Sequence, residues 1–232
     1  MCGKPESDRT DQEDLASAPN LKVEGSLESL GVAFLEYVAF HGHYPPAALY
    51  GKDGKPLLSW RVLLLPHMLD GEKIYKQFKL DEPWDSPNNR RLLKEMPAVF
   101  APPKGVKADP FTTFYRVFVG KGTAFEDRRG LSEIPDGDDR TLAVVEAAET
   151  VPWTKPDELL YDSDKPLPKL GGHIPGELYG LFFDWEVKRI KQNFDEAKMR
   201  QIILCNDGKP TPSNNEVDDT FQGLQLRRGV IE

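Results

Sequence analysis

The segment from Leu57 to Leu69, LLSWRVLLLPHML, constrains this chain more than any other, because almost every side chain in it is apolar. Such a run is too hydrophobic to lie on a surface, so we expect it to be buried on most faces. Gly51–Gly54 precedes it and predicts a tight turn, and Pro66 is expected to end or kink it. The chain has 232 residues, which is enough for one large core with loose ends.

Helical patterns occupy the first half of the chain. Apolar residues recur at helical spacing from Ser26 to Phe40, with Ser26 as the expected N-cap, and again in residues 71–80. Ser86 and Pro87 form a helix start signal, because serine caps well and proline fits the first helical position. We therefore predict at least three helices before residue 100.

Strand patterns follow. Residues 112–120 and 140–149 are rich in aromatic and β-branched side chains, and residues 178–190 read as two strands with a turn near Asp184. A short helix is expected over residues 194–205. Helices first and strands later, without regular alternation, predict an α+β fold with an antiparallel sheet.

The two ends of the chain are polar. Residues 1–24 contain too few apolar side chains to fold alone, so we expect a disordered tether, then a domain over residues 25–206 and a polar tail over residues 207–232. Cys2, followed by this tether, is similar to the lipid-bearing cysteine of processed bacterial lipoproteins. The alternative is an ordinary disordered cytosolic N-terminus with a chance cysteine.

Charge and composition exclude several classes of function. The formal net charge is −8, which opposes non-specific binding to nucleic acid or to an anionic membrane surface. No run of about 18 apolar residues is present, so no membrane span is expected. Two cysteines cannot build a disulfide framework, and no familiar nucleotide, zinc or serine-hydrolase motif occurs. We expect no cofactor.

Three groups of residues could carry chemistry, and each has a structural alternative. Alternating carboxylates suit calcium, but the remaining ligands of a calcium loop are lacking and a turn explains these residues better: Asp136, Asp138 and Asp139. Carboxylates beside an aromatic platform suit a sugar site, but turns and helix capping also account for them: Asp81, Glu82 and Asp85 around Trp84. The four histidines are His41, His43, His67 and His173, and the first two are expected to interact with a helix end rather than with a metal.

Six segments together resemble a large planctomycetal family of unknown function, described as solute-binding-protein-like, whose members have a prepilin-like leader. The segments, spread over residues 27–205, are HGHYPPA, LLSWRVLLLPHM, IYKQFKLDEPWDSPNNRRLLKEMP, TAFED, VVEA and PWTKPDEL. The resemblance implies a pilin-like layout, in which a long N-terminal helix packs on an antiparallel sheet with additional short helices. It also implies an extracytoplasmic location.

The chain departs from the family pattern in two places. Members usually begin with an uncleaved apolar helix, whereas here Cys2 and a polar segment stand first, which favours a lipid anchor over filament assembly. The family typically has a histidine, nine residues and then Asp-Gly at a strand turn. Here ten residues separate His173 from Asp184, and Trp185 replaces the glycine. A positive φ at that position would strain a tryptophan.

The leading hypothesis is a non-enzymatic, lipid-anchored envelope protein with a structural or binding role. Its partner would be an unknown protein or glycan of the cell envelope, with the membrane reached through the anchor alone and no nucleic acid bound. Its candidate ligand-binding residues are Trp84, Asp85, His173 and Asp184. One alternative is a carbohydrate- or solute-binding module that uses Trp84, Trp60 or Trp153. A second is a hydrolase that uses Asp81, Asp85 or His173.

Overall fold

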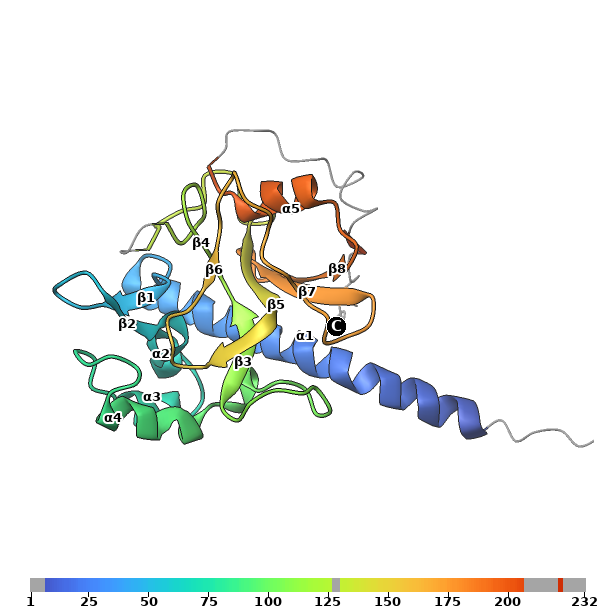
Figure 1. Ribbon diagram of the computed structural model, residues 1–232, viewed down its shortest axis with the longest axis horizontal. Helices are drawn as coiled ribbons and strands as arrows, with labels where there is room; N and C mark the ends of the chain where they lie inside the picture. Colours follow the sequence, from blue (N-terminus) through green and yellow to red (C-terminus); the bar gives the residue numbers. More distant parts are fainter. Residues whose placement is uncertain (1–6, 127–129, 207–220, 223–232) are drawn as a thin grey trace, which may run out of the picture.

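The computed structural model describes residues 7–126, 130–206 and 221–222, and it has an α+β fold in which a long helix crosses an antiparallel sheet (Figure 1). The expected fold class is therefore confirmed. In chain order the elements are α1 (Ser7–His41), β1 (Ala48–Tyr50), β2 (Pro56–Ser59), α2 (Trp60–Leu63), η1 (Leu65–His67), α3 (Gly71–Tyr75), α4 (Pro87–Arg90), η2 (Arg91–Glu95), η3 (Ala98–Phe100), β3 (Thr112–Arg116), β4 (Phe118–Val119), β5 (Leu142–Pro152), β6 (Leu159–Leu160), β7 (Glu177–Phe182), β8 (Val187–Lys191), α5 (Glu196–Ile203) and β9 (Phe221–Gln222).

The main sheet has the strand order β3-β5-β7-β8-β9, and every neighbouring pair is antiparallel. Its two faces are buried against different helices. In β7, Tyr179 and Leu181 pack in the core that contains α1, whereas Leu178 and Phe182 pack in the core that contains α5. This alternation follows from the two-residue period of a strand. The sheet thus forms the middle layer between α1 and α5.

Helix α1 begins 19 residues before the expected N-cap at Ser26. The stripe formed by Val23, Leu27, Leu30 and Phe34 is fully buried, so the packing pattern continues toward the N-terminus beyond Ser26. Lys22 adds hydrogen bonds from its Nζ to Ser26 Oγ (2.8 Å) and to the carbonyl oxygen of Ala98 (2.9 Å). Residues 7–24, expected to be a disordered tether, are helical in the structure, and residues 1–6 lie outside the described residues.

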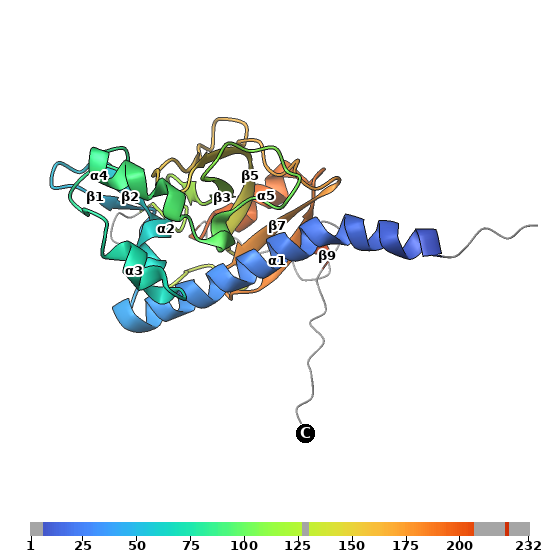
Figure 2. The same cartoon turned by 90° about the horizontal axis from the view of Figure 1, so that it is seen from below.

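The N-terminal part of α1 extends beyond the rest of the fold (Figures 1 and 2). Pro19 lies inside the helix, where it has no amide hydrogen to donate and interrupts the hydrogen-bond ladder. From about residue 22 onward the helix lies against the sheet and against η3. In the part of the chain that the structure describes, no helix is long and apolar enough to cross a membrane.

The apolar segment after residue 56 is buried as expected. The turn at Gly51 closes a β1–β2 hairpin, and Leu58, Trp60, Val62, Leu64 and Leu65 are all fully buried. The helix start at Ser86 and Pro87 is also confirmed, because Ser86 Oγ accepts a hydrogen bond from the amide of Asn89 (3.2 Å). The expected strands, the turn after β7 and the short helix α5 are all present. Most of the polar tail over 207–232 lies outside the described residues, and within it β9 pairs with β8.

Candidate ligand-binding groove beside His173

The described surface has a groove of about 710 Å³ that is lined by His173, one of the residues selected from the sequence. Another hollow, of about 410 Å³, lies elsewhere on the surface. Four separate segments form the walls of the His173 groove: Pro19 of α1, the loop before β3, Ala148 of β5, and the loop before β7. The lining residues are Pro19, Lys104, Gly105, Val106, Lys107, Ala148, Gly171, Gly172 and His173. None of the described residues that line the groove carries a carboxylate.

The imidazole of His173 is held in a defined orientation. Its Nε2 lies 2.8 Å from the carbonyl oxygen of Ala147, and its ring stacks on Phe114 with centroids 4.4 Å apart and planes 20° apart. Because a carbonyl oxygen only accepts hydrogen bonds, Nε2 is the donor and carries the proton. The other ring nitrogen, Nδ1, makes no hydrogen bond to a described residue.

Two glycines shape the loop that carries His173. Gly171 has φ +61° and Gly172 has φ +91°, conformations that side chains disfavour. At Gly171 a Cβ atom would also lie 2.9 Å from the Cβ of Leu178. The Gly171 amide donates to the carbonyl oxygen of Glu146 (2.8 Å), which fixes the loop to β5. A larger residue at Gly171 would therefore displace His173 from the groove wall.

Two lysines give the groove a positive charge. Lys104 and Lys107 come from the loop between η3 and β3, opposite the glycine loop, and neither forms an ion pair with a described carboxylate. Unpaired ammonium groups beside an imidazole and glycine backbone favour an anionic ligand, because they donate hydrogen bonds and supply opposite charge. Sequence reasoning missed both lysines, since a loop lysine carries no signal of what lies opposite it.

Asp184 does not join His173. His173 precedes β7 and Asp184 follows it. The six residues of β7 that lie between them span about 20 Å at the usual rise of a strand. There Asp184 Oδ1 accepts from the amide of Glu186 (3.0 Å), and Asp184 Oδ2 pairs with Lys188 Nζ (3.4 Å). The two residues selected from one family element therefore belong to different surfaces.

The strained turn expected after Asp184 is confirmed. Trp185 has φ +68°, the left-handed conformation that the family's glycine would adopt freely. The indole stacks on Phe34 of α1, with centroids 5.6 Å apart, and it also contacts Tyr44 and Phe183. Packing against these rings offsets the backbone strain.

The tryptophans offer little to a glycan. Trp60 and Trp153 are fully buried, which removes both as stacking platforms for the carbohydrate-binding alternative; Trp153 Nε1 donates to the carbonyl oxygen of Leu93 (3.0 Å). Trp84 is half-buried, with Lys155 Nζ 5.9 Å from its ring centroid, and Asp85 beside it is exposed. Neither Trp84 nor Asp85 lines the His173 groove.

The remaining candidates do not assemble into a metal centre. Among the described residues, no three His, Cys, Asp or Glu side chains converge to hold an ion. Asp138 Oδ1 accepts from the hydroxyl of Tyr44 (3.3 Å), and Asp139 pairs with Arg140, while the Asp136 amide donates to the carbonyl oxygen of Cys205. The turn interpretation therefore accounts for these carboxylates. Cys2 lies outside the described residues.

The histidines at the end of α1 form a ring cluster. His41 occupies the last turn of α1 and stacks on Tyr37 with centroids 4.1 Å apart, and His67 lies 5.5 Å from His41. Burial lowers the pKa of both His41 and His67, and each also has a neighbouring histidine that lowers it further. These imidazoles thus pack at the helix end.

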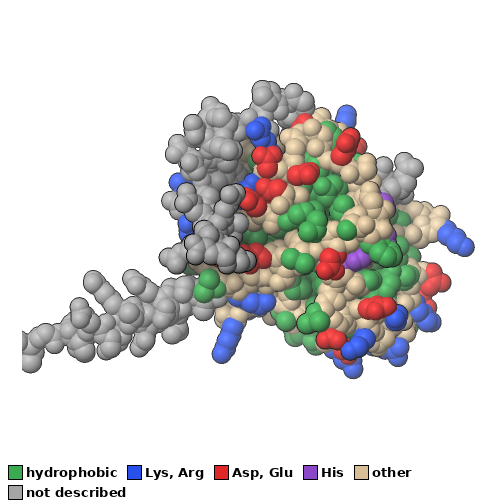
Figure 3. Space-filling view, turned by 180° about the vertical axis from the view of Figure 1, so that it is seen from behind, with side chains coloured by type: hydrophobic (Ala, Val, Ile, Leu, Met, Phe, Trp, Pro, Cys, Tyr) green, Lys and Arg blue, Asp and Glu red, His purple; other side chains and the backbone are tan. Residues whose placement is uncertain are grey.

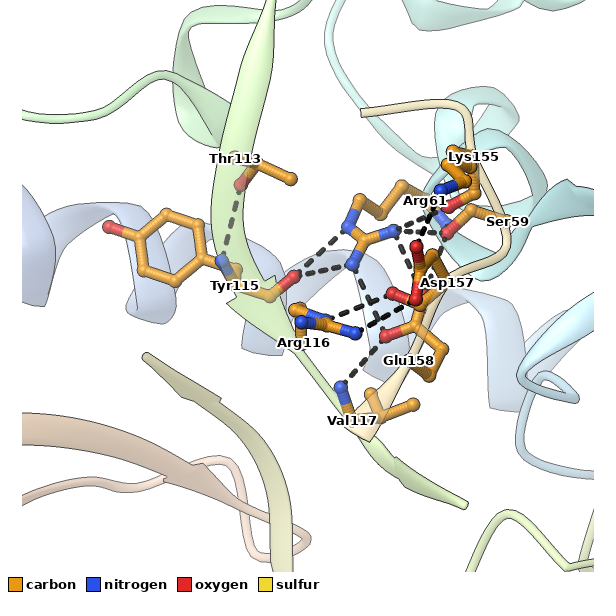
Figure 4. Close-up of polar contacts among 9 residues, drawn as sticks. All are labelled: Ser59, Arg61, Thr113, Tyr115, Arg116, Val117, Lys155, Asp157 and Glu158. Carbon is orange, nitrogen blue, oxygen red and sulfur yellow. Dashed lines mark hydrogen bonds and ion pairs between the residues drawn. The ribbon is translucent and has the colours of Figure 1, made fainter. Parts of the chain in front are cut away.

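A buried ion pair, missed from the sequence, joins two of the segments that carry the family resemblance. Arg61 of LLSWRVLLLPHM lies 3.0 Å from a carboxylate oxygen of Glu158, which belongs to PWTKPDEL (Figure 4). The guanidinium also donates from Nε (3.0 Å) and Nη2 (2.7 Å) to the carbonyl oxygen of Tyr115, and Glu158 Oε2 accepts from the amide of Val117 (3.0 Å). Burial raises the pKa of the Glu158 carboxyl, and the Arg61 charge opposes that shift.

This pair is structural rather than a ligand site, because both side chains are almost completely buried. Beside it, Arg116 donates to the backbone carbonyl of Asp157 and pairs with its carboxylate at 3.1 Å. The network ties the β2–α2 segment to β3 and to the chain before β6 (Figure 4). A buried charge left without its partner is costly, which explains why an arginine within an apolar run requires a specific glutamate.

A second buried carboxyl lies between α1 and the sheet. Glu146 of β5 is 1% exposed, and its Oε2 accepts a hydrogen bond from the amide of Tyr179 in β7 (2.5 Å). Burial raises its pKa to about 8, and the single amide bond opposes that rise. The signal in the sequence was the acidic residue inside the apolar strand VVEAA.

Comparison with known proteins gives one match. Residues 25–128 match the model of a family described as "Protein of unknown function (DUF1559)". The resemblance to a solute-binding-like family of unknown function is therefore confirmed over that segment. No curated protein and no solved structure matches the chain.

Proposed function

We propose that this protein is a non-enzymatic, extracytoplasmic envelope protein that binds an anionic partner, such as an acidic glycan, in the groove beside His173. The observation that carries the proposal is the groove itself: its lining combines the oriented imidazole of His173 with Lys104 and Lys107, and neither lysine forms an ion pair with a described carboxylate. A ligand with carboxylates or phosphates would supply the missing negative charges. The pilin-like layout implied by the family resemblance is part of the same proposal.

The chemistry of the groove favours binding over catalysis. Its lining supplies a hydrogen-bonding imidazole from His173 and positive charge from Lys104 and Lys107. The Nε2 of that imidazole is already bonded to a backbone carbonyl. Asp81 and Asp85, the carboxylates of the hydrolase alternative, do not line the groove. A general acid and base at one place, which hydrolysis would need, is thus not provided by these residues.

The anchor is proposed at Cys2. In the sequence this cysteine precedes a polar segment and α1, and the N-terminal part of α1 extends beyond the rest of the fold (Figure 1), so a lipid on Cys2 would hold the groove away from the membrane surface. Metabolic labelling with palmitate tests this directly in the full-length gene product. We expect labelled, membrane-associated wild-type protein and unlabelled Cys2→Ser protein; an unlabelled cytosolic wild-type pool would contradict the anchor.

Binding can be tested with a defined acidic glycan. We expect fluorescently labelled oligogalacturonate to bind the wild-type protein, with affinity falling as salt rises, and the fully methyl-esterified oligomer to bind at least about tenfold more weakly. Replacing both groove lysines, Lys104→Gln with Lys107→Gln, should reduce affinity by about tenfold. The matched control replaces two exposed lysines outside the groove, Lys52→Gln with Lys121→Gln. Equal loss in both pairs would point to net charge alone and would refute the groove.

A further inference from the structure

The outward face of α1 carries an apolar ridge between two hollows. Leu21, Val32 and Leu35 follow spacings of eleven and three residues, so they lie on one side of the helix. Within this ridge Val32 is 57% exposed and Leu35 52% exposed. A hollow of about 410 Å³ lies on one side, against η1 and η3, and one of about 280 Å³ lies on the other, against the β7–β8 turn. Val32 lines both hollows.

Carboxylates surround this ridge. Glu24, Glu28 and Glu186 line the smaller hollow, and Glu36 lines the larger one. None of the four forms an ion pair with a described residue. Figure 3 shows hydrophobic side chains gathered on this face with acidic ones among them. Burial and the nearby charge of Glu28 raise the pKa of Glu24, and the charge of Arg189 lowers it, so a further cation beside Glu24 and Glu28 would reduce the repulsion between these two carboxylates.

The geometry also limits what kind of chain could cover the ridge. A helix face presents side chains only, because the backbone amides and carbonyls of α1 bond along its own axis. A strand or loop laid on it would leave its own backbone groups without partners, whereas a helix satisfies them internally. A ridge with a hollow on each side is the arrangement into which the side-chain rows of a second helix fit.

We infer that this α1 ridge is a docking surface for a cationic amphipathic helix of a partner protein, with leucine-like side chains in the two hollows and lysines or arginines beside the four glutamates. A second copy of this chain fits poorly, because two such faces would bring eight like charges together. The inference concerns a different surface from the His173 groove and stands independently of it.

The test uses the full chain and three synthetic 18-residue peptides. The first peptide is a leucine–lysine sequence with a helical period, the second has the same composition in scrambled order, and the third has glutamate in place of lysine. Fluorescence anisotropy measures affinity at low and high salt, and amide chemical shifts identify the residues affected. We expect the first peptide to bind best, and its shifts to fall in residues 24–36 and 185–187.

Two pairs of variants separate the apolar and the charged contributions. Val32→Ser with Leu35→Ser should weaken binding at least about tenfold, and the exposed control Leu160→Ser should leave it unchanged. Glu24→Gln with Glu28→Gln should weaken binding about fivefold at low salt and little at high salt, and Glu149→Gln serves as its control.

Several results would overturn the inference. These are equal binding of the scrambled peptide, tighter binding of the acidic peptide, shifts confined to other surfaces, or unchanged affinity in the Val32→Ser, Leu35→Ser variant. Concentration-dependent dimerisation that this double variant abolishes would assign the ridge to a second copy instead. All variants are at exposed or half-exposed positions, and circular dichroism confirms that they remain folded before binding is measured.

Discussion

Substitution of Glu146 by glutamine should change how the stability of this protein depends on pH. The carboxyl is buried between α1 and the sheet, and its pKa is raised to about 8 from an ordinary value of 4.5. At a pH between these two pKa values, Glu146 is protonated in the folded protein and ionised in the unfolded chain. Since the folded state then binds more protons, the free energy of unfolding falls as pH rises.

The magnitude follows from the two pKa values. Each pH unit inside the window removes about 1.4 kcal/mol, so raising the pH from 5 to 7 should cost the wild-type protein about 2.7 kcal/mol from this group. Glutamine resembles the protonated acid, can still accept the Tyr179 amide, and does not titrate. Relative to wild type, Glu146→Gln should therefore gain about 2.7 kcal/mol over the same range, or about 5–11 °C in melting temperature.

Urea denaturation followed by far-UV circular dichroism at pH 5, 6 and 7 measures this difference. Comparing the two proteins cancels the contributions of the other titrating groups, such as His41 and His67, which both share. Glu149→Gln, an exposed site on the same strand, is the matched control and should follow the wild-type pH dependence. Parallel pH profiles for wild type and Glu146→Gln would refute the reasoning.

Two further predictions concern features that hold the fold together. Arg61→Met and Glu158→Gln should each destabilise the protein by about 3–5 kcal/mol, because each single change leaves a buried partner without its counterpart. The double variant should lose clearly less stability than the sum of the two single variants. A double-mutant cycle in urea measures this difference, and simple additivity would contradict the pairing. Trp185→Gly should be more stable than Trp185→Ala by about 1–2 kcal/mol, because the positive φ of +68° strains alanine but not glycine, while both variants lose the same indole contacts. Urea denaturation compares the two variants. Equal or reversed stabilities would mean that the backbone at residue 185 leaves the positive-φ conformation once the indole is gone.

Much of the fold could be predicted from local patterns. The apolar segment after residue 56, the cap at Ser86 and the strand pair around Asp184 are short-range signals, and each is confirmed. The start of α1 was placed too late because residues before Ser26 look polar on average. Val23 alone continues the buried stripe, and its burial depends on the sheet packed beneath it.

The candidate site was harder to predict because it depends on contacts between distant segments. His173, one of the residues selected from the sequence, lies in the groove lining, but Lys104 and Lys107 come from a loop about 70 residues earlier, and no local pattern pairs them with it. The same holds for Arg61 and Glu158, which are 97 residues apart. Conversely, Trp60 and Trp153 are core residues, although a tryptophan can also serve as a stacking platform for a sugar. The residue type alone does not distinguish the two roles.

The most direct measurement of the proposed function is an amide chemical-shift titration of the full chain with oligogalacturonate. The account predicts saturable shifts in residues 104–107 and 171–173, together with a shift of the His173 ring signals, and their loss in the Lys104→Gln, Lys107→Gln variant. Shifts that spread over the surface without saturation, or that fall outside the groove, would contradict a built anion-binding site beside His173.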